Sequence, residues 1–229
     1  PHTTGALYYK MNDNYPGVSW SCVDYYGIIK PVHYFVQKSF APLAAVMLFD
    51  RSNLASQEVS LPAYLLDDCQ TLEKEPYQVK VSIYNALLDT VATHTFNGIG
   101  DDNVVKKLGE INLNREQTKS TMLFFVLDII KDNKNIYRNY YFTNYEGRPG
   151  SIVSMPQTEI KMERTGNMVT LTNTGKHPAI GVHVEVPEKM DQLIVSENYI
   201  WLNPQESKIL KINLESPVIV KGWNLQSPY

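Results

Sequence analysis

Residues 77–85 have the sequence Tyr-Gln-Val-Lys-Val-Ser-Ile-Tyr-Asn, which indicates the fold class. Apolar side chains at positions 77, 79, 81 and 83 alternate with the polar Gln78, Lys80 and Ser82. Successive side chains of a strand point to opposite faces, so this alternation predicts a β-strand with one face in a core and the other in water. A single strand of this kind has to pair with others to bury its apolar face.

Similar short runs lie on both sides of this stretch. Those before residue 143 predict seven strands of one antiparallel Ig-like sandwich. They are residues 44–49, 57–66, 77–85, 90–96, 109–113, 121–130 and 135–142. Residues 143–154 have no apolar periodicity, and Gly147, Pro149 and Gly150 favour a connection there. We therefore expect one sandwich over residues 43–147.

A second, smaller set of strand patterns follows this connection. Its clearest member is residues 179–186, where Ile180, Val182 and Val184 alternate with smaller or polar side chains. Turns are predicted at residues 165–167 and 203–206. The other strand candidates are residues 158–163, 168–172, 199–202, 208–214 and 218–220. We expect a second Ig-like sandwich over residues 148–229, which makes the chain all-β in class.

The first 42 residues have a different pattern, which we call the leader. Residues 7–13 predict a short strand, and residues 14–17 a turn. Pro31 suits a first helical position, and Val32, Phe35, Val36 and Phe40 recur with the spacing of one apolar stripe, so a helix is expected to run from Pro31 to the Ala41-Pro42 step. A lone strand-loop-helix unit cannot bury its stripe by itself. The leader should therefore end something larger or pack on the sandwiches.

Bulk composition excludes several classes of partner. The 229 residues carry a net charge of −3 with a pI near 6.0, which provides no basic field for nucleic acid or anionic membrane surfaces. No apolar run approaches the length of a membrane span. The chain begins at Pro1 rather than methionine, so we expect a fragment of a longer protein. The compartment stays open, with a periplasmic or secreted location favoured.

The two cysteines and the candidate metal ligands favour structural roles. Cys22 and Cys69 are predicted to fall in separate structural units, so two buried free thiols are expected rather than a disulfide. Residues 101–103 could bind calcium or form a solvated turn, and the sequence favours the solvated turn. The histidines are scattered without metal-ligand spacing, so we expect neither a metal nor a cofactor. They are His2, His33, His94, His177 and His183.

The three tryptophans allow two interpretations. A surface platform for sugar stacking would need them exposed, whereas a tryptophan in a strand pattern is more often part of a core. The core interpretation is favoured. The residues are Trp20, Trp201 and Trp223.

Several short motifs of the leader resemble one known family. In order they are residues 5–16, Val-Ser-Trp-Ser at 18–21, Asp-Tyr-Tyr-Gly at 24–27 and Lys-Pro-Val-His-Tyr-Phe at 30–35. They resemble the segment that closes the catalytic (β/α)8 barrel in family 2 glycoside hydrolases, in the β-mannosidase and exo-glucosaminidase branch. Residues 197–199, 202–204 and 222–224 resemble the terminal Ig-like domain of that family. The resemblance implies two antiparallel Ig-like sandwiches preceded by a strand-loop-helix remnant of the barrel.

The resemblance also implies one substrate-binding residue. The family has tryptophan, glutamine and tryptophan where this chain has Tyr9, Lys10 and Tyr15. In the family, the aromatic side chain at the Tyr9 position floors the sugar pocket, at the end of the last barrel strand, where barrel enzymes place their sites. Tyrosine still offers a ring to a sugar, with less area, so the exact sugar preference stays open.

No catalytic residue is expected in this chain. Retaining glycosidases use two carboxyl groups roughly 5–5.5 Å apart. The family places both glutamates on earlier barrel strands, and the first glutamate here is Glu58, in the first sandwich. The leader has only Asp13 and Asp24, so the chain alone is expected to be inactive.

The resemblance implies an exo-acting, retaining parent enzyme that cleaves terminal β-mannosides. It would reach its β-linked carbohydrate through the missing barrel, and the sandwiches would contact and support that barrel. Two alternatives stay open: an exo-β-glucosaminidase of the same family, and a free-standing carbohydrate-binding or adhesive module with no enzyme attached. Neither nucleic acid nor a membrane is an expected partner.

Overall fold

The structure is a computed structural model that describes residues 6–49, 58–102, 105–114, 122–144, 154–187 and 192–226. It divides into two compact units. Lys38–Pro156 form one unit, and Pro1–Gln37 together with Gln157–Tyr229 form the other. The leader as far as Gln37 thus groups with the C-terminal residues, and its last five residues belong to the other unit. The partition into domains at residues 1–42, 43–147 and 148–229 stays a prediction, and most of the predicted connection, at residues 145–153, lies outside the described residues.

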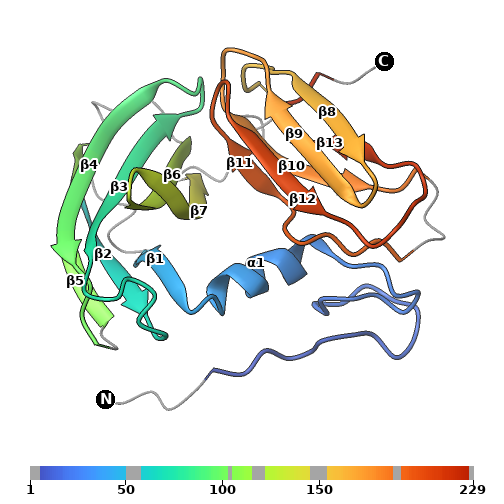
Figure 1. Ribbon diagram of the computed structural model, residues 1–229, viewed down its shortest axis with the longest axis horizontal. Helices are drawn as coiled ribbons and strands as arrows, with labels where there is room; N and C mark the ends of the chain where they lie inside the picture. The colour runs from blue at the N-terminus through green and yellow to red at the C-terminus, as the bar shows by residue number, and fades with distance from the viewer. Residues whose placement is uncertain are drawn as a thin grey trace. The chain divides into compact units, whose positions relative to one another are not determined.

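The unit of Lys38–Pro156 is a sandwich of two antiparallel sheets (Figure 1). One sheet has the order β1-β2-β5, with β1 at Leu43–Met47, β2 at Glu58–Asp67 and β5 at Val105–Asn114. The other has the order β4-β3-β6-β7, with bounds Thr90–Ile99, Pro76–Asn85, Met122–Lys131 and Lys134–Asn144. Every pair of neighbouring strands is antiparallel. The all-β, Ig-like fold class is confirmed.

The alternation at residues 77–85 produces the predicted strand. Val79, Val81 and Ile83 of β3 are fully buried, whereas Lys80 is exposed. Their side chains join the core between the sheets, together with Leu61 from β2 and further apolar side chains of β5 and β6. A side chain of this kind contributes roughly 1.5–3 kcal/mol when fully buried, so this face holds the two sheets together.

Strand β5 begins four residues earlier than the sequence predicts. Its pairing with β2 shifts register between Ala63 and Tyr64, opposite Gly109 and Lys107. The extra residue is a β-bulge, which breaks the period of two on which the prediction depends. Lys106 and Lys107 are consecutive charged residues, so the first part of the strand also lacks the alternation from which a strand is predicted.

The second unit also contains two antiparallel three-stranded sheets (Figure 1). One has the order β12-β9-β8, with bounds Ser207–Lys211, Met168–Asn173 and Ile160–Thr165. The other has the order β11-β10-β13, with bounds Ile200–Leu202, Ala179–Glu185 and Ile219–Lys221. β8 and β9 form a hairpin in which Thr165 pairs with Met168, as the predicted turn requires. The core includes Leu171 and Val182, and Tyr34 of the leader joins it.

The leader contains the predicted helix but not the predicted strand. Helix α1 runs over Pro31–Ser39, so Pro31 occupies its first position and the chain leaves the helix before Pro42. Residues 7–13 form no strand, which corrects the prediction: Asn12 makes one isolated bridge with Val23. A strand takes its hydrogen bonds from neighbouring strands. The described residues provide no strand beside this segment, which exchanges backbone hydrogen bonds with Cys22 and Val23 instead. No described helix has the length and apolar character of a membrane span.

The cysteines differ in exposure. Both are free, and Cys22 is buried as expected, but Cys69 is exposed. The reason is local. Strand β2 ends at Asp67, whose carboxylate accepts hydrogen bonds from the amides of Thr71 and Leu72. This interaction closes a turn, and Cys69 lies within it rather than on a core-facing strand position.

Candidate functional site

Tyr9, the residue that the resemblance assigns to substrate, is strongly exposed in the structure. Its side chain is 75% exposed, and the Tyr9–Lys10 peptide bond is cis. The preceding Tyr8 is held instead, because its hydroxyl donates a hydrogen bond to the carbonyl of Trp20. Tyr9 therefore lies on a segment that is fixed on either side, while its own ring is open to a ligand.

Large aromatic side chains are exposed along residues 6–30, the described part of the leader before helix α1, which we call the leader loop. Those that expose half of their surface or more are Tyr9, Tyr15, Trp20, Tyr25 and Tyr26. Apolar side chains exposed in such number indicate a surface that other groups cover or bind. The other two tryptophans differ: Trp201 is buried, whereas Trp223 is half-buried with its indole close to Gly181. The structure therefore does not provide a platform of three exposed tryptophans.

A buried carboxylate holds the leader loop together. Asp13 accepts hydrogen bonds from Ser19 Oγ at 2.5 Å and Ser21 Oγ at 2.7 Å. The Nζ atoms of Lys10 and Lys30 each lie 3.0 Å from one of its carboxylate oxygens. We call these five residues the Asp13 cluster. It joins three stretches of the leader that lie up to twenty residues apart in the sequence.

The Asp13 cluster lowers the pKa of its carboxyl group well below the usual range. The hydrogen bonds from Ser19 and Ser21 are the main causes, and those from Lys10 and Lys30 add to them. Such a group stays ionised and fully hydrogen-bonded, so it is unsuited to act as a general acid or base near neutral pH.

Asp24, the other carboxylate of the leader, is also structural. Its Oδ1 accepts hydrogen bonds from the amides of Tyr26 at 2.9 Å and Ile28 at 2.8 Å. This geometry closes a turn in which Gly27 has a φ of 84°. In the described part of the leader, both carboxylates are therefore occupied by local hydrogen bonds.

The candidate metal ligands are not clustered. Among the described residues, no group of three or more histidine, cysteine, aspartate or glutamate side chains could hold a metal ion. Asp101 and Asp102 form ion pairs with Lys106 at 3.0 Å and Lys74 at 3.3 Å. Asn103, the third candidate calcium ligand, lies outside the described residues.

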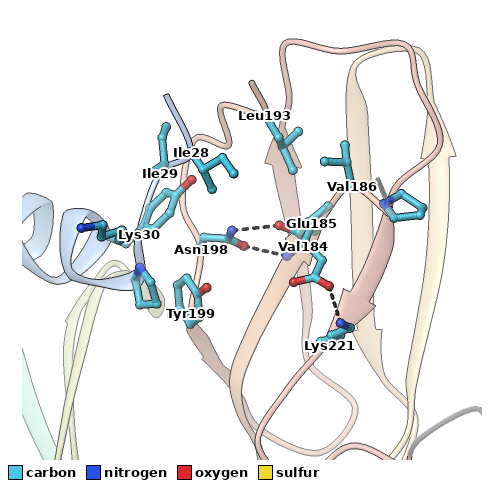
Figure 2. Close-up of a pocket in the computed structure, with 13 residues that line it drawn as sticks. Ile28, Ile29, Lys30, Val184, Glu185, Val186, Leu193, Asn198, Tyr199 and Lys221 are labelled. Carbon is cyan, nitrogen blue, oxygen red and sulfur yellow. Dashed lines mark hydrogen bonds and ion pairs between the residues drawn. The ribbon is translucent and has the colours of Figure 1, made fainter. Parts of the chain in front are cut away.

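The structure contains a pocket that sequence reasoning did not find. Its volume is about 360 Å³, and it lies between the leader and the C-terminal sandwich (Figure 2). Residues 28–31 and Tyr34 line it from the leader, and residues 184–187, 193, 198, 199 and 221 from the sandwich. No local pattern links these positions, because they lie some 150 residues apart in the sequence.

Charged and aromatic side chains meet at this pocket. The carboxylate of Glu185 forms an ion pair with Lys221 on the neighbouring strand (Figure 2). The ring of His183 stacks on Tyr199 with centroids 4.4 Å apart and an interplanar angle of 17°. The amide of Asn198 accepts from the backbone N–H of Val184 at 2.8 Å and donates to its carbonyl at 3.1 Å.

Tyr199 has an unusual backbone conformation. Its φ of 55° falls in the left-handed region, where a bulky residue is a genuine outlier. Burial raises the pKa of Tyr199 to about 12, with smaller contributions from Glu185 and Tyr34. Its phenol therefore keeps its proton at all physiological pH values. Backbone strain of this kind is often found where a side chain is held for function.

One protein family matches the C-terminal part of the chain. The exo-β-D-glucosaminidase Ig-fold domain matches residues 150–225. This range takes in all six strands of the second sandwich.

Curated mammalian β-mannosidases share shorter stretches with the chain. The goat enzyme (Capra hircus) is 44% identical over 59 residues, and the rat enzyme (Rattus norvegicus) is 49% identical over 45 residues. These stretches are 26% and 20% of this chain, but only 7% and 5% of the two enzymes. The matches therefore cover a small part of each relative.

Solved structures of two glycosidases share the fold over nearly the whole chain. The exo-chitosanase of Amycolatopsis orientalis superposes with a TM-score of 0.75 and 17% identity, over 97% of this chain and 30% of that chain. The β-D-mannosidase of Dictyoglomus thermophilum superposes with a TM-score of 0.69 and 20% identity, over 95% and 26%. At such low identity, these likenesses show the fold.

Together these findings define the class of the chain as paired antiparallel sandwiches of the Ig-like type that glycosidases carry. Its second sandwich matches the exo-β-D-glucosaminidase Ig-fold domain. As a whole, the chain resembles the C-terminal region of β-mannosidase-like enzymes of glycoside hydrolase family 2, and the resemblance carried by its motifs is confirmed.

Proposed function

We propose that this chain is the non-catalytic C-terminal region of an exo-acting, retaining glycosidase that removes terminal β-mannosyl residues. The observation that carries the proposal is the 44–49% identity to mammalian β-mannosidases over 45 to 59 residues. The fold, shared with the Dictyoglomus thermophilum β-D-mannosidase over 95% of the chain, is compatible with this proposal.

The state of the leader's carboxylates supports the proposal that this region is not catalytic. A retaining mechanism needs one carboxylate free to attack and another able to exchange a proton. In residues 6–42, Asp13 accepts from two hydroxyl groups and two ammonium groups, and Asp24 accepts from two backbone amides. Neither is available for such a role, so the catalytic pair has to come from another part of the protein.

Tyr9 is the residue of this chain proposed to face the substrate. A tyrosine ring can lie against the C–H face of a sugar while its hydroxyl bonds to water or to the ligand. The ring is exposed, while Tyr8 and the Asp13 cluster fix the segment around it. The β-linked carbohydrate would thus meet this chain only at the floor of a pocket completed by a catalytic barrel.

The sandwiches are proposed to support that barrel through the leader. Leu7 and Val18 are fully exposed, and the large aromatic side chains of the loop are exposed with them. A surface of this kind costs free energy in water and is normally covered by a partner. The partner proposed here is the catalytic barrel of the same protein.

An exo-β-glucosaminidase is the second candidate, because a specific observation favours it. The family that matches residues 150–225 is named for exo-β-D-glucosaminidases, and the exo-chitosanase shares the fold over 97% of the chain. The replacement of tryptophan by Tyr9 leaves the choice between mannose and glucosamine to experiment.

The complete reading frame and the 229-residue chain should be assayed side by side with aryl β-mannoside and aryl β-glucosaminide. We expect the complete protein to prefer the β-mannoside and to release it with retained anomeric configuration, observed by NMR. The isolated chain should stay at the no-enzyme rate. Preference for the glucosaminide would favour the second candidate. Turnover by the isolated chain that is lost in Asp13→Asn would contradict the non-catalytic assignment.

A further inference from the structure

The pocket between the leader and the C-terminal sandwich has the size of a small-molecule site. Its volume of about 360 Å³ lies within the range of 300–1,000 Å³ that is typical of ligand pockets. Much of its lining is aliphatic, with Ile28 and Ile29 on one side and Val184, Val186 and Leu193 on the other (Figure 2). A helix or strand of another protein would not fit in it, but a single ring would.

Two of the polar side chains that line the pocket already have other roles. The ammonium of Lys30 belongs to the Asp13 cluster, 2.7 Å from Ser21 Oγ and 3.0 Å from Asp13 Oδ2. The amide of Asn198 is bound to both backbone groups of Val184. The charged groups that remain for a ligand are therefore Glu185 and Lys221.

Glu185 and Lys221 form a neutral pair that is partly open to water. Their side chains are 38% and 57% exposed, so each can change partners without losing solvation entirely. A carboxylate accepts hydrogen bonds and an ammonium group donates them, so the pair can bind the adjacent hydroxyl groups of one ligand. An ionic ligand gains little here, because each charge already faces its opposite.

The aromatic lining of the pocket is fixed before any ligand arrives. Stacking on His183 and the left-handed backbone of Tyr199 hold its ring, and Tyr34 lies 5.9 Å from it between centroids. The ligand that fits this arrangement is neutral and compact, with an apolar face and one edge of hydroxyl groups. A pyranose ring has this chemistry.

We propose that this pocket binds a neutral pyranose, whose hydroxyl edge contacts Glu185 and Lys221 and whose C–H face lies against the aliphatic and tyrosine lining. The ligand class follows from the pocket itself and goes beyond the proposed glycosidase function. The ring would bridge residues 28–34 and the sandwich, which both line the site.

Binding can be measured on the 229-residue chain, where no hydrolysis is needed, so the result is independent of the glycosidase assay. Methyl β-D-mannopyranoside and methyl β-D-glucopyranoside are the probes, followed by saturation-transfer NMR and calorimetry. Cyclohexanemethanol, which has a similar ring without the hydroxyl edge, is the control ligand. We expect saturable binding of at least one glycoside and at least tenfold weaker binding of the control.

Substitutions of the residues that line the pocket test whether the glycoside binds there. Glu185→Gln and Lys221→Met should each weaken it about tenfold, which is typical for a lost hydrogen bond to a charged group. Leu193→Trp should abolish it by filling the pocket while the ion pair remains. Glu163→Gln is the matched control, because Glu163 pairs with Lys161 at 2.9 Å on the exposed surface of the same unit. It should leave binding unchanged.

Two results would overturn the proposal, and a third would count against it. One is the absence of saturable glycoside binding to a chain whose thermal unfolding is cooperative. The other is binding that survives in Leu193→Trp with unchanged affinity, since the sugar would then lie elsewhere. Equal loss in the Glu163→Gln control would also count against it, because the effect would not depend on the pocket.

Discussion

The ammonium of Lys30 lies 3.0 Å from Oδ2 of Asp13, seventeen residues earlier in the chain. Backbone hydrogen bonds also connect these segments. The amide of Asp13 donates to the carbonyl of Val23 at 3.0 Å, and the amide of Lys30 donates to the carbonyl of Cys22 at 2.9 Å. The segment that carries Tyr9 is thus fixed to the start of helix α1 through one charged group. The conformation of the leader should depend on that charge.

Removal of the Asp13 charge should loosen the leader. The carboxylate of Asp13 accepts from two hydroxyl groups and two ammonium groups. In Asp13→Asn one of its oxygen atoms becomes an NH2 group, which donates hydrogen bonds, so several of these bonds are lost. We expect the amides of Cys22 and Val23 to exchange with deuterium at least tenfold faster, measured by mass spectrometry. Asp68→Asn, an exposed turn residue of the other unit, is the control. Unchanged exchange in Asp13→Asn would show that backbone bonds alone hold the leader.

The same carboxylate predicts the pH dependence of leader order. The pKa of Asp13 is lowered in the folded chain, first by Ser19 and Ser21, whereas an unfolded aspartate titrates near 3.9. A lowered folded pKa contributes stability that is fully present above the unfolded value and is lost as the pH falls through the folded one. Exchange protection of Val23 should therefore fall below about pH 4 in the native chain, and more gently in Asp13→Asn. Parallel curves for the two proteins would contradict the assignment.

Gly181 should tolerate no side chain. Its φ is 59°, and a Cβ atom there would lie 2.5 Å from Cε2 and Nε1 of Trp223. Gly166 has a φ of 58° with nothing within 4 Å of the same position, so it isolates the backbone effect. We expect Gly166→Ala to lower the free energy of unfolding by about 1 kcal/mol and Gly181→Ala by about 3 kcal/mol, because displacement of the indole adds to the strain. Chemical denaturation measures both, and equal losses would mean that the indole moves aside freely.

The ion pair of Asp128 and Arg138 should be costly to break. Nε of Arg138 lies 2.6 Å from Oδ1 of Asp128, and both side chains are largely buried. Loss of one partner from a buried pair typically costs 3–5 kcal/mol, whereas an exposed pair contributes less than about 1 kcal/mol. Asp128→Ala should therefore lower the free energy of unfolding by about 3 kcal/mol, and Glu163→Ala, in an exposed pair, by less than about 1 kcal/mol. Similar losses in the two variants would place the Asp128 pair among the weak surface pairs.

The strands could be predicted where one period holds along the whole element. The alternation that includes Val79, Val81 and Ile83 predicts β3, because a single face of the strand packs in the core. The start of β5 was missed because a bulge opposite Ala63 and Tyr64 interrupts its period. The strand predicted at residues 7–13 was wrong for another reason: a short local run describes one segment, but a strand also requires neighbours to pair with.

The candidate sites could be predicted only in part. Tyr9 came from a resemblance over the leader, and its role stays a prediction. The Asp13 cluster left no period in the sequence, since its serines and lysines contact one carboxylate only after the loop has folded. The pocket is lined by Ile28 of the leader and Val184 of β10 together, a long-range arrangement that no local pattern encodes.

The last prediction tests Tyr9 in the complete enzyme. Aromatic contacts contribute about 0.5–1.5 kcal/mol beyond their buried area, and the lost area adds to this, so Tyr9→Ala should lower kcat/KM for the aryl β-mannoside by tenfold or more. Tyr9→Trp keeps a ring at the exposed position and should retain much of the activity. Trp223→Ala is the control, because its indole packs on Gly181 and its loss should lower the melting temperature without changing kcat/KM per folded molecule. If Tyr9→Ala keeps kcat/KM within about twofold, far below the effect of a lost aromatic contact, Tyr9 does not face the sugar.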